Sequence, residues 1–163
     1  MKMPKILVVV VFLLLMAANT VAGQSIVGSW RLISYEDVDE KGVVVRPWGE
    51  HPLGILIYDD SGHMAVQIQR MPLAKGTAKN ALTPNKHDKL AFFDSYIAYF
   101  GTYKVDTIKM TVTHFVEGNF FASLVGTSSE KAFEITGDRF LLKPVWVENG
   151  HKITGTRVFE RMK

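Results

Sequence analysis

The sequence predicts an all-β protein: an antiparallel up-and-down barrel of eight to nine strands, with one short helix between strands four and five. Two observations predict this fold. From Ile26 onward, apolar and polar residues alternate in short runs, which is typical of strands with one buried face. Turn residues separate the runs, and 163 residues favour one compact domain. In such a domain, closing the sheet is the economical way to remove its exposed edges.

The first four runs are expected to form strands joined mainly by tight turns. Residues 39–42 close the first run, because the glycine at their end can adopt the positive φ that a hairpin needs. The β-branched second run stops at Pro47. Residues 59–62 (DDSG) carry the strongest hairpin signal in the chain. The expected strands are 28–36, 43–46, 53–58 and 63–70.

The segment 71–83 breaks this rhythm and precedes the expected helix. Thr83 followed by Pro84 is typical of a helix start, with threonine as the cap and proline at the first helical position. The helix is expected at 86–95, with Leu90, Phe92 and Phe93 as its apolar contacts. The long segment and the helix together could cover one mouth of the barrel.

Five further strands are expected after the helix, at 96–105, 108–117, 127–136, 139–147 and 152–161. The last two are joined at Asn149-Gly150, which predicts a type I′ hairpin turn. Side chains alternate between the faces of a strand. The alternation places His114 on an apolar face of its strand, together with Ile108, Met110, Val112 and Val116. On the last strand it places Ile153, Arg157, Phe159 and Arg161 on one face.

Residues 1–23 are expected to be a secretory signal, and 24–163 the barrel domain. Lys2 and Lys5 form a basic start, and an apolar run at 6–18 follows. This run is shorter than the about 20 residues that span a bilayer as a helix. Cleavage after Ala22 or Gly23 would leave a secreted or periplasmic protein without a stable membrane anchor, whereas an uncleaved anchor is the alternative.

Composition excludes several kinds of function. The chain has no cysteine, which excludes disulfides, zinc–cysteine centres and thiol nucleophiles. Removing Lys2 and Lys5 from the 19 basic residues leaves 17 against 16 acidic ones. Without a concentrated basic face, nucleic acid is not an expected partner. The five histidines show no metal-binding spacing, so neither a metal nor a cofactor is expected.

Residues 28–30 (GSW) resemble the G-x-W signature of lipocalins. In that superfamily, a basic residue from the end of the barrel packs across the tryptophan; Arg161 matches this role, with Arg157 as the alternative. The resemblance therefore implies structural roles for Gly28, Trp30 and Arg161. Further segments resemble the small bacterial and fungal lipocalin-like domain family, namely 28–35, 46–49, 54–58, 96–103 and 116–118. This resemblance implies a lipocalin-type (calycin) barrel with a central cavity.

Aromatic walls with a few polar groups suit a small hydrophobic ligand. The residues expected to bind it are Tyr58, His63, Tyr99, Tyr103, Met110, His114 and Phe133. The alternative is a barrel packed solid by its own side chains. A buried histidine bonded to a neighbouring tyrosine is also the simpler interpretation of His114.

The leading hypothesis is an exported lipocalin-like protein that binds a small hydrophobic molecule. The lack of a recognisable catalytic constellation favours binding over catalysis. One alternative is a cofactor-free cyclase or isomerase acting on a polyketide- or polyene-like substrate, with His114 and a tyrosine as proton partners. Some relatives in natural-product pathways look like such cyclases. The other alternative is a non-catalytic structural or protein-binding barrel.

Overall fold

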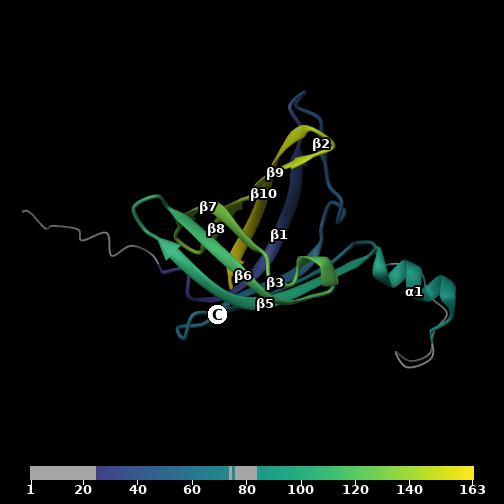
Figure 1. Cartoon of the computed structure of the whole chain (residues 1–163), viewed down its shortest axis with the longest axis horizontal. Helices are drawn as coiled ribbons and strands as arrows, with labels where there is room; N and C mark the ends of the chain where they lie inside the picture. Colours follow the sequence, from purple (N-terminus) through teal and green to yellow (C-terminus); the bar gives the residue numbers. More distant parts are fainter. Residues whose placement is uncertain (1–24, 74, 76–83) are drawn as a thin grey trace, which may run out of the picture.

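A computed structural model describes residues 25–73, 75 and 84–163 (Figure 1). The expected signal at 1–23, the expected helix cap Thr83 and most of the segment 71–83 lie outside the described residues. The elements follow one another as β1 (Gly28–Val38), β2 (Val44–Val45), β3 (Leu53–Tyr58), β4 (His63–Gln69), α1 (Lys86–Phe93), β5 (Tyr96–Asp106), β6 (Thr111–Asn119), η1 (Ala122–Leu124), β7 (Ser128–Thr136), β8 (Arg139–Lys143), β9 (Val145–Glu148) and β10 (His151–Arg161).

Eight antiparallel strands close into a barrel in the order β1-β3-β4-β5-β6-β7-β8-β10, and β1 pairs with β10 to complete the ring. The predicted fold is therefore confirmed. The two extra strands, β2 and β9, lengthen the barrel beside β1 and β10 (Figure 1). The expected single strand at 139–147 is divided at Pro144, because proline has no N–H for the ladder.

The helix α1 follows β4, as expected, but it begins differently. Its N-cap is Asn85, whose side chain accepts a hydrogen bond from the Asp88 backbone N–H at 2.9 Å. The apolar side chains of α1 do not enter the barrel core: Phe93 is 45% exposed and packs on Phe120, with ring centroids 4.7 Å apart. In the described part of the chain, no helix has the length and apolar character needed to cross a membrane.

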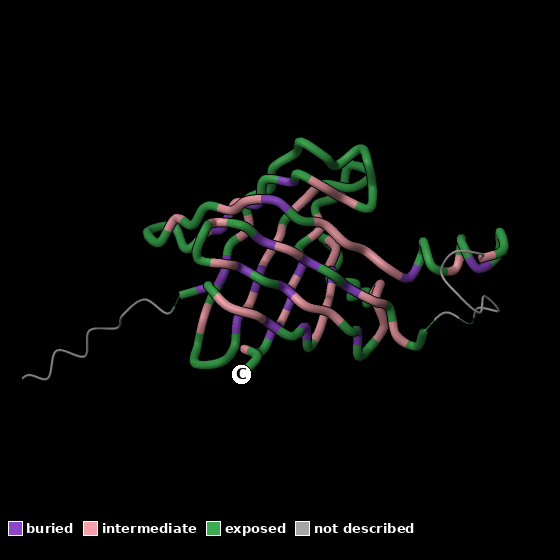
Figure 2. Tube along the Cα trace, turned by 90° about the horizontal axis from the view of Figure 1, so that it is seen from below, coloured by how far each residue is buried: buried purple, intermediate pink, exposed green. Residues whose placement is uncertain are grey.

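Buried and exposed residues alternate along the barrel strands (Figure 2), and the buried face of β1 changes at a bulge. The register between β1 and β10 shifts between Leu32 and Ser34. Before the shift, Trp30 and Leu32 point into the barrel. After it, Tyr35 and Asp37 do so, because one extra residue reverses the alternation. The bulge thus brings to the interior two residues, Tyr35 and Asp37, that would face outward if the alternation set by Trp30 and Leu32 continued unbroken.

Trp30 belongs to the part of the barrel interior that is filled by packed side chains. It is 0% exposed, lies 5.1 Å from Phe140 between ring centroids and donates a hydrogen bond from Nε1 to the Ile26 carbonyl oxygen at 2.7 Å. The Arg161 guanidinium carbon lies 4.0 Å from the Trp30 ring centroid, which favours a cation–π interaction. A Cβ at Gly28, where φ is +136°, would meet Arg161 Nη1 at 2.8 Å. The glycine therefore leaves room for this arginine.

Candidate functional site

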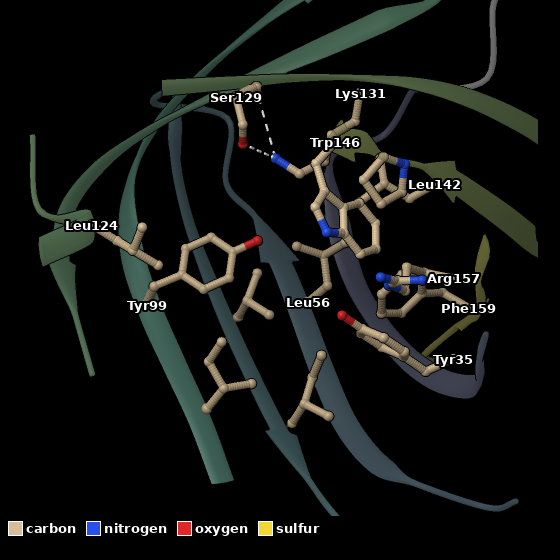
Figure 3. A pocket seen from close by; sticks show the side chains of 14 residues that line it. Tyr35, Leu56, Tyr99, Leu124, Ser129, Lys131, Leu142, Trp146, Arg157 and Phe159 are labelled. Carbon is tan, nitrogen blue, oxygen red and sulfur yellow. Dashed lines mark hydrogen bonds between the residues drawn. The ribbon is translucent and has the colours of Figure 1, made fainter. Parts of the chain in front are cut away.

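The barrel contains a cavity of about 360 Å³, within the size range of small-molecule pockets. Side chains from both halves of the barrel surround it (Figure 3). Fourteen residues of the described part of the chain line it; eleven of these are apolar or aromatic, and the other three are Ser129, Lys131 and Arg157. The interior is therefore filled around Trp30 and hollow between Tyr35, Tyr99 and Trp146.

Of the residues expected to bind a ligand, Tyr99 lines this cavity. Tyr58, His114 and Phe133 are buried in the packed interior. Tyr103 packs on Tyr58, with ring centroids 4.7 Å apart, and its hydroxyl donates to the Asp59 carbonyl oxygen at 2.7 Å. The structure thus brings these aromatic residues together, but of them Tyr99 alone lines the cavity.

His63 and Met110 lie away from the cavity. The His63 side chain is 60% exposed, and its Nδ1 lies 3.7 Å from Asp59 Oδ2; its strand neighbour Met64 is the residue that points inward. Met110 occupies the turn before β6, with φ of 53° and 43% exposure. The alternation expected from Ile108 begins only at Thr111, because the turn takes up the residues before it.

His114 is held between two tyrosines. Its Nε2 lies 2.6 Å from the Tyr58 hydroxyl and its Nδ1 lies 3.2 Å from the Tyr99 hydroxyl. Burial, and secondarily the nearby Lys131 charge, holds the pKa of His114 well below its usual value. Burial also raises the pKa of Tyr58 and Tyr99. All three side chains are therefore uncharged at neutral pH, and they connect the packed interior with the cavity wall.

Replacing His114 with leucine is expected to remove part of the acid sensitivity of the fold. Because the folded state lowers the pKa of His114, its stabilising contribution is present above pH about 6.5 and is lost as the unfolded chain takes up a proton below that pH. The free energy of unfolding should therefore fall with decreasing pH by up to about 1.4 kcal/mol per pH unit on account of His114. Urea unfolding of the native protein and H114L between pH 7.5 and 5.5 measures it.

At pH 7.5, H114L should itself be less stable by about 1–3 kcal/mol, because two buried hydroxyls lose their partner. The control is H151L, since the His151 side chain is 62% exposed; this variant should keep the native pH slope. A native slope in H114L would show that His114 is not the group that titrates.

Arg157 is a buried cation with a counter-ion, a backbone acceptor and an aromatic ring as partners. Its Nη2 lies 2.7 Å from Asp37 Oδ1, its Nη1 donates to the Glu36 carbonyl oxygen at 2.6 Å, and its guanidinium carbon lies 3.2 Å from the Tyr35 ring centroid. Burial raises the pKa of Asp37, and Arg157 opposes that shift. The alternation places Arg157 on the interior face from sequence alone. The inward positions of Asp37 and Tyr35 depend on the β1 bulge.

Lys131 is the functional candidate that the sequence reasoning missed. It lies two residues before Phe133 on β7, so the same alternation that turns Phe133 inward also turns Lys131 inward. Its Nζ donates hydrogen bonds to the Ser129 carbonyl oxygen at 3.2 Å and to the Ser129 hydroxyl. Burial, followed by repulsion from Arg157, lowers the pKa of Lys131 to about 8. In the sequence, the feature that could have identified Lys131 is its spacing of two residues from Phe133, which places a basic side chain on the same face as an apolar one.

Comparison with known protein families identifies the family of this chain. The family described as lipocalin-like domain matches residues 27–160, and the chain therefore belongs to the lipocalin-like domain family. Searches of curated proteins and of solved structures gave no significant match. Within residues 25–73, 75 and 84–163, no three histidine, aspartate or glutamate side chains gather in a way that could hold a metal ion.

Proposed function

We propose that the protein binds a small hydrophobic molecule in its barrel cavity. The observation that supports this most directly is the cavity of about 360 Å³ with mainly apolar and aromatic walls, since burial of apolar surface is the main source of affinity for such ligands. Membership in the lipocalin-like domain family is consistent with this role. The signal-like segment at 1–23 supports an exported protein, secreted or periplasmic.

The site favours binding over the cyclase or isomerase alternative. His114 is 0% exposed, hydrogen-bonded at both ring nitrogens, and not among the residues that line the cavity. A proton transfer to a ligand would therefore have to pass through Tyr99. Because burial raises the pKa of the Tyr99 hydroxyl, this group is a weak acid at neutral pH. The hollow interior also argues against a barrel that has only a structural role.

Filling the cavity should weaken the binding of a neutral apolar probe. N-phenyl-1-naphthylamine, which fluoresces in apolar surroundings, is expected to bind the native protein with an affinity that I97W lowers by about tenfold or more, equivalent to at least about 1.4 kcal/mol. Ile97 lines the cavity from β5, so the larger side chain would occupy ligand space. Fluorescence titration of both proteins measures the change.

The matched control is Q67W, because Gln67 is an exposed residue on the neighbouring strand β4. This variant should bind the probe like the native protein. Circular dichroism spectra of both variants check that the barrel is intact. No probe binding by the native protein, or equal weakening in both folded variants, would refute binding in the cavity.

A further inference from the structure

We infer that the cavity selects hydrophobic molecules that carry one anionic group of the carboxylate class, and that Lys131 binds this group. The inference rests on the proposed binding function and specifies the ligand that the site accepts. It follows from an imbalance of charge in the cavity, from the polar groups that surround the charged atom and from the apolar walls beside them.

Among the described residues, the cavity lining contains two cations, Lys131 and Arg157, and no carboxylate. Arg157 has its own counter-ion in Asp37, at 2.7 Å. Lys131 forms no ion pair with any carboxylate of the described residues, and its hydrogen-bond partners are neutral oxygens of Ser129. One positive charge at the cavity wall is therefore uncompensated.

An uncompensated charge beside an apolar cavity has a direct consequence for the ligand. Removing a cation from water is costly unless an opposite charge or strong hydrogen bonds replace the water. A neutral ligand that filled the cavity would remove more water from Lys131 and supply no counter-charge. An anionic group at Lys131 would provide the missing partner, while the apolar body of the ligand contacts the remaining walls.

The surrounding hydroxyls complete an anion site. In Figure 3 the hydroxyls of Tyr99 and Tyr35 point toward the space that the Lys131 amino group borders. If Nδ1 of His114 carries the ring proton, Tyr58 donates to Nε2 and the imidazole donates to the Tyr99 oxygen. The Tyr99 hydroxyl proton is then available to a carboxylate oxygen in the cavity. The buried histidine thus has a positioning role behind the anion site.

The same arrangement makes anion binding sensitive to alkaline pH. Among the described residues, the charged or titratable groups that line the cavity with Lys131 are Tyr35 on β1, Tyr99 on β5 and Arg157 on β10. Asp37 on β1 pairs with Arg157, and His114 on β6 bonds to Tyr99 and interacts electrostatically with Lys131. The tyrosine pKa values are raised and that of His114 is lowered, so these three stay neutral as pH rises from 7 to 9. Lys131, with a pKa of about 8, loses its charge in that interval.

The test compares three ligands that share one chain and differ in the head group: decanoate, decan-1-ol and decylamine. Each competes with N-phenyl-1-naphthylamine at pH 7.0 for the native protein, K131M and K143M. The native protein is expected to bind decanoate about tenfold or more tighter than decan-1-ol, and decylamine most weakly. K131M should lose this preference for decanoate and bind decan-1-ol at least as tightly as the native protein does. Raising the pH from 7 to 9 should weaken decanoate binding to the native protein and to K143M, but not to K131M.

K143M is the matched control, because Lys143 lies on the adjacent strand β8 and pairs with Glu134 outside the cavity lining. It should keep the native preference. Equal affinities of the native protein for decanoate and decan-1-ol, or loss of the preference in both variants, would overturn the inference while hydrophobic binding stands. Absence of probe binding would instead refute the proposed function, and the inference with it.

Discussion

Replacing Arg157 with methionine is expected to lower the free energy of unfolding by about 3–5 kcal/mol. The substitution leaves the carboxylate of Asp37, a residue that is 8% exposed, without the cation that lies 2.7 Å away. It also removes the donor to the Glu36 carbonyl oxygen and the guanidinium that packs on Tyr35. Urea unfolding followed by circular dichroism at pH 7.5 measures the loss.

Two further variants separate the buried ion pair from a general effect of losing an arginine. R46M removes a cation from a solvent-exposed pair, in which Arg46 Nη2 lies 2.7 Å from Glu36 Oε1, and should change stability far less. The double variant D37L/R157M should recover most of the lost stability, because an apolar pair leaves no buried charge unpaired. A loss in R157M no larger than in R46M would contradict the assignment.

Replacing Trp30 with alanine is expected to cost about 3–5 kcal/mol of unfolding free energy, the range for truncating a fully buried large aromatic residue. Trp30 is 0% exposed, packs against the ring of Phe140 and has the Arg161 guanidinium over its own ring. Its loss would leave a void in the filled part of the barrel and remove the hydrogen bond to Ile26. Far-UV circular dichroism is the suitable signal, since the substitution itself alters tryptophan fluorescence.

The matched control is W146A. Trp146 is partly exposed and already borders the cavity, so its truncation enlarges an existing space and should destabilise the barrel less than W30A does. Equal losses in the two variants would show that the Trp30 cluster is not the principal packed core. Together, the variants distinguish the part of the barrel that stabilises the fold from the part that is available to a ligand.

Local features of the sequence were sufficient to predict most of the barrel. Apolar alternation and turn residues located the strands, because a strand buries every second side chain and a tight hairpin requires particular residues at its turn. The same alternation placed His114 in the interior, where it is 0% exposed. It failed at Met110, because the turn before β6 delays the start of this strand to Thr111, later than the apolar pattern indicates.

The cavity depended on features that local patterns do not contain. The bulge in β1 reverses the alternation, so Tyr35 and Asp37 face inward although Trp30 and Leu32 predict the opposite parity. Closure of the ring by β1 and β10 then brings Asp37 to Arg157. A pairing between residues so far apart in the chain depends on register, which is set only when the whole sheet assembles.

By itself, the sequence determined the barrel class, the places of most strands and the presence of an arginine on an interior face, because these follow from short-range periodicity and turn chemistry. Only the tertiary structure decided which part of the interior is filled and which is hollow. It also decided that Lys131 and Arg157 border the same cavity and that only Arg157 has a counter-ion among the described residues. Cavity shape and charge balance are properties of strands that meet across the barrel, and closure of the sheet is the physical step that creates them.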